Sequence, residues 1–126
     1  MAKTIWHVDD DEEMLRAMDL MLKMLGYETR FFMHARPAAE ALLAGGKPNA
    51  LLLDINMPEV SGLDMLEFLR RRATWTTLAI VMLSTEAADV TVDKAMQLGA
   101  DGYITKPVTL DELERELNKA IIKRNL

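Results

Sequence analysis

The chain has 126 residues, of which 50% are hydrophobic and 28% charged, so it is long enough to bury a core and is typical of one globular domain. Its net charge of −5 argues against direct nucleic-acid binding, because a phosphate backbone is bound by clustered Lys and Arg. The absence of cysteine excludes disulfides and thiolate metal sites and fits a reducing compartment, so we expect a cytoplasmic location.

Neither a secretion signal nor a membrane span is expected. The N-terminal residues lead directly into a short apolar run and then acids, and every apolar stretch is far shorter than the roughly 20 residues that cross a membrane. We expect residues 1–126 to form one domain, with its core within about residues 3–124.

The first half of the chain predicts strands that alternate with helices. Short apolar or alternating runs indicate strands, whereas apolar residues at three- and four-residue steps indicate helices. Gly26 ends the first helix, Pro37 suits the first turn of the second, and Asp54 closes an uninterrupted apolar strand. The predicted elements are a strand over 4–8, a helix over about 14–25, a strand over 27–33, a helix over 37–44, a strand over 50–54 and a helix over 63–69.

The second half continues the same alternation. It predicts a strand over 78–83, a helix through 92–98 that Gly99 ends, a strand over 102–105 and a last helix. Thr109 and Glu112 match a capping box at the start of that helix, so Thr109 is the expected N-cap.

Strict alternation of strands and helices predicts an α/β fold, with a parallel sheet and helices on both faces. The C-terminal ends of parallel strands share one edge, where ligands bind in such sheets. Reactive or ionic residues follow four of the five predicted strands at this edge: Asp9 and Asp10, Asp54, Ser84 and Lys106.

Three carboxylates at one edge require a positive partner. Each pair of unit charges about 4 Å apart repels by about 4 kcal/mol at an effective dielectric constant of ~20. Oxygen ligands without His or Cys favour Mg²⁺, with Mn²⁺ as the alternative. We expect Asp10 and Asp54 as direct ligands and Asp9 as a ligand through water.

Asp54 is the candidate nucleophile, because it is the only acid at the end of the central apolar strand. A carboxylate can accept a phosphoryl group, and the protein then has to position that group and neutralise its charge. Lys106 supplies a cation for one phosphoryl oxygen, and Ser84 supplies a hydroxyl donor for another.

The chain resembles the receiver domains of the CheY-like response regulators over essentially its whole length. The matching segments are Val8-Asp9-Asp10-Asp11, Leu53-Asp54-Ile55-Asn56-Met57-Pro58 followed by Ser61-Gly62, Met82-Leu83-Ser84, and Gly99-Ala100-Asp101-Gly102-Tyr103-Ile104-Thr105-Lys106-Pro107. Their agreement in kind, order and spacing is much more specific than any one motif.

The resemblance implies a (βα)5, flavodoxin-like fold with the doubly wound strand order 2-1-3-4-5. It implies that Asp54 is the phosphoacceptor and that Asp9 and Asp10 are the acid pair for the metal. The backbone carbonyl of Asn56 is the remaining implied protein ligand, and a cis bond is implied at Lys106-Pro107.

The resemblance also implies a switch pair, Ser84 and Tyr103, in which the hydroxyl moves toward the phosphoryl group and the ring turns inward. Asn56 and Glu86 occupy the two positions that tune the lifetime of the acyl phosphate in receivers. Thr85 departs from the family pattern, which has Ala or Gly after the switch hydroxyl, and it puts access to the site in question.

The implied function is phosphorylation-dependent signalling without turnover of a separate substrate. A sensor histidine kinase or a histidine phosphotransfer protein donates the phosphoryl group. The change passes to the surface formed by the last two helices and the strand over 102–105, which binds a downstream protein target or output domain. Phosphorylation-linked homodimerisation is a further option.

Two alternatives stay open. A phosphatase or phosphotransferase of the haloacid-dehalogenase type also uses an Asp nucleophile, a Lys and Mg²⁺, but it places a second Asp where this chain has Asn56. A degenerate receiver that serves as a binding scaffold is supported only by Thr85, because the five site residues are present.

Overall fold

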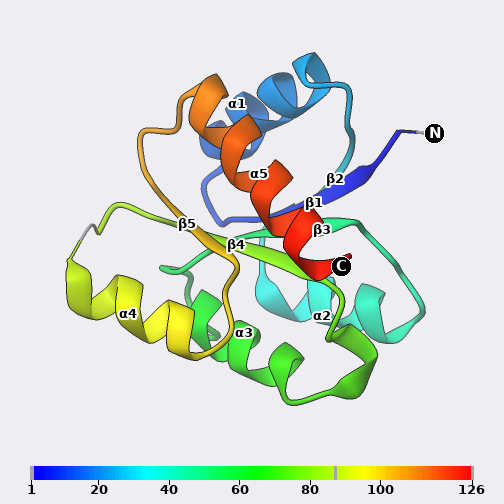
Figure 1. Cartoon of the computed structure of the whole chain (residues 1–126), viewed down its shortest axis with the longest axis vertical. Helices are drawn as coiled ribbons and strands as arrows, with labels where there is room; N and C mark the ends of the chain where they lie inside the picture. The colour runs from blue at the N-terminus through cyan, green and yellow to red at the C-terminus, as the bar shows by residue number, and fades with distance from the viewer. Residues whose placement is uncertain (1, 87, 126) are drawn as a thin grey trace.

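The computed structural model describes residues 2–86 and 88–125. Within these residues, five strands alternate with five α-helices and one short 3-10 helix (Figure 1). The elements are β1 (Thr4–Val8), α1 (Glu12–Met24), β2 (Glu28–Phe32), α2 (Ala35–Leu43), β3 (Ala50–Asp54), α3 (Gly62–Arg70), η1 (Ala73–Trp75), β4 (Ala79–Ser84), α4 (Asp89–Gln97), β5 (Gly102–Thr105) and α5 (Leu110–Arg124). No helix in the described ranges has the length and apolar character to cross a membrane.

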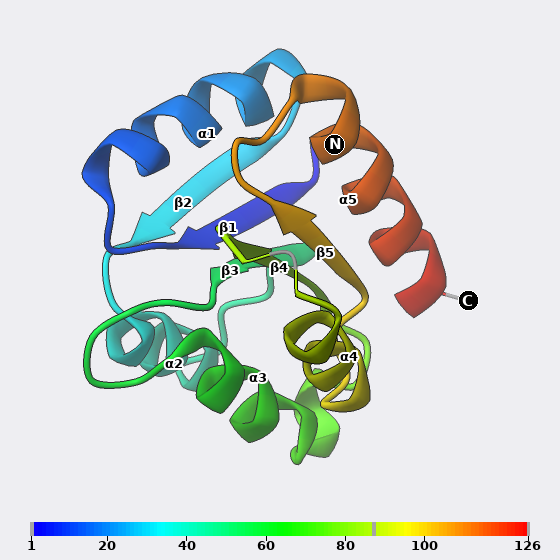
Figure 2. The ribbon, with the colours of Figure 1, turned by 90° about the vertical axis from the view of Figure 1, so that its left-hand side faces the viewer.

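The strands form one parallel sheet in the order β2-β1-β3-β4-β5, as the resemblance implied. Helices α1 and α5 cover one face, and α2, α3 and α4 cover the other (Figures 1 and 2). The register pairs Asp54 of β3 with Leu83 of β4, and Ser84 of β4 with Thr105 of β5. The C-terminal ends of these strands therefore lie together at one edge.

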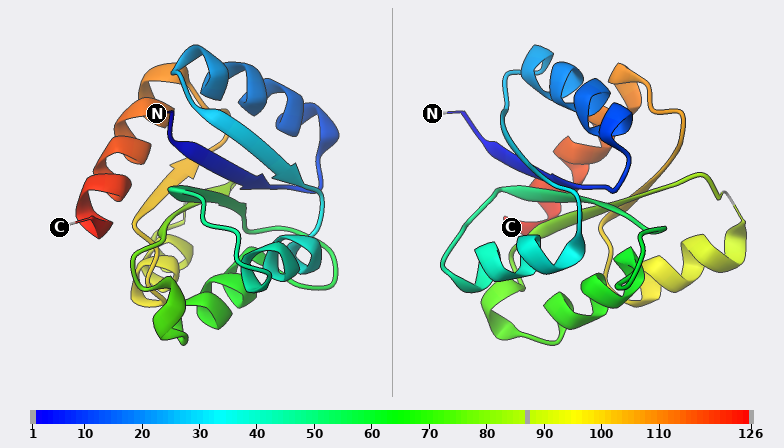
Figure 3. Two further views of the ribbon diagram at one scale, coloured as in Figure 1. Left: turned by 90° about the vertical axis from the view of Figure 1, so that its right-hand side faces the viewer. Right: turned by 180° about the vertical axis from the view of Figure 1, so that it is seen from behind.

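Each face of the sheet has its own apolar layer. Leu52 and Leu83 pack with the buried residues of α1 and α5, whereas Leu53 and Met82 pack with those of α2, α3 and α4. Figure 3 shows the two helical layers on opposite sides of the sheet. Successive residues of a strand point to opposite faces, so a central strand that is covered on both sides is apolar throughout. This explains why β3 and β4 show no polar alternation before their last residues.

Two helices begin earlier than predicted. The side chain of Asp11 accepts hydrogen bonds from the backbone N–H groups of Glu13 and Met14, so α1 begins two residues before the predicted residue 14. Helix α2 also begins earlier, at Ala35, which places Pro37 inside its first turn. The predicted N-cap of α5 is confirmed, because Thr109 Oγ1 accepts from the N–H of Glu112 at 3.2 Å.

Candidate functional site

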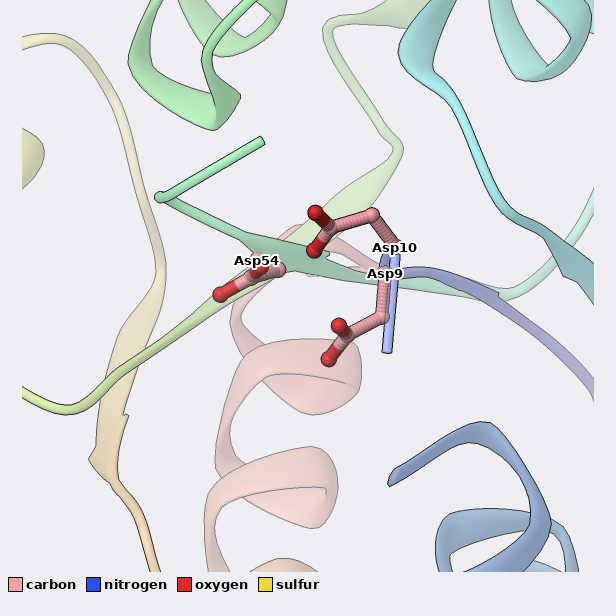
Figure 4. Close-up of side chains that lie close together, drawn as sticks. All are labelled: Asp9, Asp10 and Asp54. Atoms are coloured by element: carbon pink, nitrogen blue, oxygen red, sulfur yellow. The ribbon is translucent and has the colours of Figure 1, made fainter. Parts of the chain in front are cut away.

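Three aspartates meet at the C-terminal edge of the sheet. Asp9 follows β1 directly, Asp10 comes next, and Asp54 is the last residue of β3. One carboxylate oxygen of each lies within 4.8 Å of the others, and the side chains of Asp9 and Asp10 both turn toward Asp54 (Figure 4). Asp9 and Asp54 are buried, whereas Asp10 is exposed, so the cluster opens to solvent on one side.

Lys106 connects the two buried acids. Its Nζ lies 3.1 Å from Asp9 Oδ2 and 3.3 Å from Asp54 Oδ1, and its side chain is only 16% exposed. The backbone N–H of Lys106 donates to the carbonyl of Ser84 at 2.8 Å, which anchors the start of the β5–α5 loop to β4. The Lys106-Pro107 bond is cis, as the resemblance implied.

Burial and neighbouring charges separate the pKa values of the two buried acids. Burial, followed by the charge of Asp9, raises the pKa of Asp54 to about 6 against the opposing effect of Lys106. Burial acts to raise the pKa of Asp9 too, but the His7 imidazole, the N–H of Asp11 and the Lys106 ammonium bring it below its usual value. Burial acts to lower the pKa of Lys106, and the two acids more than reverse this.

The cluster fits a hard divalent cation. The three acids offer only oxygen ligands, and one ammonium group faces three carboxylates. Burial first, and then the charge of Asp9, raises the pKa of Asp54, so a cation at the cluster would favour its ionised form. The assignment of Asp10 and Asp54 as direct ligands and of Asp9 as a ligand through water stays a prediction. So does the role of the Asn56 carbonyl, in the exposed loop two residues beyond Asp54.

The predicted switch residues are linked through the β4–α4 loop. Ser84 is fully buried, and its Oγ accepts from the N–H of Glu86 at 3.0 Å. The hydroxyl of Tyr103, a half-buried residue of β5, donates to the carbonyl of the same Glu86 at 2.8 Å. Thr85, between Ser84 and Glu86 in the sequence, is exposed. Ser84 and Tyr103 are therefore connected through the backbone of Glu86.

Sequence reasoning gave no individual role to two residues beside the site. One is His7, whose Nε2 lies 3.4 Å from Asp9 Oδ2. Residues two apart on a strand share a face, so the spacing of His7 and Asp9 carried this signal. Gly62 begins α3 against the end of β3, where an added Cβ would lie 2.1 Å from the Asp54 carbonyl oxygen.

Comparison with known proteins agrees with this geometry. Residues 5–118 match the family model of the response regulator receiver domain. The chain is 34% identical over 120 residues to the transcriptional regulatory protein KdpE of Mycobacterium tuberculosis, covering 94% of this chain and 50% of KdpE. It is 35% identical over 111 residues to the chemotaxis protein CheY1 of Helicobacter pylori, covering 87% of this chain and 90% of CheY1.

The fold comparison gives the same assignment. A CheY-like receiver domain protein from Methanospirillum hungatei superimposes with a TM-score of 0.86 and 25% identity, covering 99% of this chain and 98% of the other. This chain spans about half the length of KdpE, which is a longer protein. The extent of the family match and the identity to CheY1 show that this chain belongs to the response regulator receiver domain family of two-component signalling.

Proposed function

We propose that this domain is a phosphorylation switch that accepts a phosphoryl group on Asp54 with Mg²⁺, or alternatively Mn²⁺, as its cofactor. The observation that carries the proposal is the convergence of Asp9, Asp10 and Asp54 at one sheet edge, with Lys106 shared by the two buried acids. These carboxylates and the Asn56 carbonyl would hold Mg²⁺, which would supply positive charge to the transferring phosphoryl oxygens.

The chain's own residues have distinct parts in the transfer. An oxygen of the ionised Asp54 attacks phosphorus, and the new O–P bond forms while the bond from phosphorus to the donor breaks and the donor leaves with its electron pair. Lys106 already contacts Asp54, so a small movement of its Nζ neutralises one phosphoryl oxygen. Ser84 exchanges its role as acceptor from Glu86 for that of a donor to another phosphoryl oxygen.

The same contacts connect phosphorylation to the molecular surface. Because Ser84 and Tyr103 both bond to the backbone of Glu86, moving the hydroxyl releases or re-forms the contact of Tyr103. The surface of α4, β5 and α5 is thereby altered for a downstream protein target or output domain, or for homodimerisation. The expected phosphoryl donor is a sensor histidine kinase or a histidine phosphotransfer protein in the cytoplasm. The proposed domain comprises residues 1–126.

Mass spectrometry of the protein treated with Mg²⁺ and acetyl phosphate tests the phosphoacceptor. We expect one added phosphate in the wild type, its loss with EDTA, and no adduct in Asp54→Asn. Asp93→Asn on exposed α4 is the matched control and should be modified like the wild type. An equal adduct in Asp54→Asn contradicts the assignment of Asp54, and the absence of any adduct in the wild type supports the degenerate receiver.

Turnover of a small phosphate ester tests the enzyme alternative. We expect no sustained release of phosphate from p-nitrophenyl phosphate, because the position of the general acid of haloacid-dehalogenase enzymes is occupied by Asn56, whose amide is not an acid. Multiple turnovers that Asp54→Asn abolishes would instead support a phosphatase.

A further inference from the structure

His7 is a buried polar residue that the proposed mechanism does not use. It lies in β1 between Phe31 of β2 and Leu52 of β3, and it is 1% exposed. Among the described residues, neither ring nitrogen has a partner with hydrogen-bond geometry. Ile5, two residues earlier on the same face, packs in the apolar layer beneath α1 and α5. An apolar side chain would thus fit the surroundings of His7, and packing alone does not explain an imidazole there.

Asp9 is the acceptor that lies nearest to this imidazole. His7 Nε2 is 3.4 Å from Asp9 Oδ2, so a small rotation of either side chain would form a hydrogen bond. The imidazole can donate to Asp9 when Nε2 carries a proton, and in the neutral ring one of the two tautomers does so.

The two hydrogen-bond donors to Asp9 differ in whether they also bind another group. The N–H of Asp11 donates to Asp9 Oδ1 at 3.0 Å and is fixed by the backbone. Oδ2 accepts from Lys106 Nζ at 3.1 Å, but the same ammonium also bonds to Asp54 Oδ1 at 3.3 Å. If Lys106 follows the phosphoryl group on Asp54, Oδ2 of the buried Asp9 loses the one hydrogen-bond donor that it has among the described residues.

We propose that His7 is a positioning residue whose Nε2–H supports Asp9 Oδ2 beside Lys106 and holds it alone when Lys106 moves from Asp9 to the phosphoryl group. This inference rests on the proposed function, in which Asp9 binds the cation and Lys106 binds the phosphoryl group. A ligating carboxylate generally needs an outer partner to fix its orientation. The imidazole supplies that partner from the buried layer between the sheet and helices α1 and α5, where water does not reach.

Two variants of similar size separate hydrogen bonding from packing. His7→Met keeps a long side chain without a donor, and His7→Gln returns an amide N–H near the position of Nε2. We expect Mg²⁺, titrated by calorimetry, to bind His7→Met roughly tenfold more weakly than the wild type and His7→Gln about as tightly as the wild type. Wild-type affinity in His7→Met, or an equal loss in both variants, would overturn the proposal.

The handover from Lys106 is tested by a double-mutant cycle. In Lys106→Met, Asp9 Oδ2 has lost the ammonium, so we expect His7→Met to weaken Mg²⁺ binding by a larger factor than it does when Lys106 is present. An equal or smaller factor would show that the two residues do not share the support of Asp9.

Wild-type protein gives an independent measurement if the His7 variants do not fold. The chain has two histidines, and His34 is exposed, so His34→Gln assigns the imidazole ¹⁵N signals of His7. We expect the Nε2–H tautomer, and the Nδ1–H tautomer would contradict the proposal. Absence of an acetyl phosphate adduct in a wild type that binds Mg²⁺ is instead a failure of the proposed function, which the His7 titrations do not measure.

Discussion

At the scale of single residues, the site depends on side chains that occupy the end of a buried strand. Asp54 is 3% exposed and lies between the repulsion of Asp9 and the attraction of Lys106. Its carboxylate is therefore less stable in ionised form than it would be in water, which is a cost in the free energy of folding. A cation at the cluster removes this cost, so ion binding and folding stability are coupled.

Asp54→Asn should stabilise the metal-free protein at neutral pH. The folded pKa of about 6 exceeds the usual 3.8, so the folded state holds the proton more tightly and wild-type stability falls as the pH rises from about 4 to about 6. We expect the variant to unfold with a free energy about 3 kcal/mol higher in EDTA, with the difference shrinking toward pH 4. Urea unfolding across this range measures it, and a pH-independent difference would contradict the explanation.

Gly62→Ala should disturb Asp54 without touching any charge. A Cβ at Gly62 would lie 2.1 Å from the Asp54 carbonyl oxygen, so α3 and the end of β3 must separate. We expect a loss of about 2 kcal/mol in unfolding free energy and slower phosphorylation by acetyl phosphate. Gly45→Ala is the control, because its added Cβ meets no atom within 4 Å and only its left-handed backbone is strained. It should lower stability without changing the phosphorylation rate.

At the scale of elements, a buried ionic cluster stabilises the N-terminal ends of the strands, which here are called the pole of the sheet opposite the candidate site. Asp101 precedes β5, and its carboxylate accepts from Arg70 of α3 at 2.9 Å, from Arg124 of α5 at 2.7 Å and from the N–H of Ile80 at 2.9 Å. Because α3 and α5 lie on opposite faces, one carboxylate links both helical layers to β4. The strands are thus fixed at this pole while the loops at the other remain available for the site.

Asp101→Asn should destabilise the fold while leaving the phosphoacceptor intact. The variant removes the charge that compensates two partly buried guanidinium groups, so we expect a loss of about 2 kcal/mol in unfolding free energy. The exposed Asp93→Asn should change it by less than about 0.5 kcal/mol. Thermal or urea unfolding measures both variants. Full loss of the acetyl phosphate adduct in a folded Asp101→Asn would show that the two poles are coupled.

At the scale of the whole molecule, two apolar layers flank a sheet whose central strands contribute to both. Leu52 and Leu53 are adjacent and fully buried, but they belong to opposite layers. The sheet is therefore held in place from both sides, and its edge strand β2 is much less covered than β3.

Truncations on both faces should accordingly be costly. We expect Leu52→Ala and Leu53→Ala each to lower the unfolding free energy by about 2 to 5 kcal/mol. Phe31→Ala in β2 should cost less, because that side chain is 42% exposed. Denaturant unfolding of the three variants provides the comparison. A small effect of either leucine variant would contradict a sheet that is packed on both faces.

The alternation of strands and helices, and the edge at which Asp9, Asp10, Asp54 and Lys106 meet, could be predicted from the amino-acid sequence. These follow from local periodicity and from the shared direction of parallel strands, which require no knowledge of side-chain positions. The strand order came from the resemblance to a family, because periodicity does not specify which strands are neighbours.

The contacts between residues distant in the sequence could not be predicted and are known only from the folded structure. The distances from Lys106 to two acids, the support of Asp101 by two helices, and the clash at Gly62 depend on how layers pack. The place of His7 beside Asp9 follows from the strand period. Its burial, and the lack of hydrogen-bond partners for its ring nitrogens among the described residues, appear only when α1 and α5 cover that face. Local sequence fixes the direction of a side chain along its strand, whereas its partners and its solvation are set by the segments that fold over it.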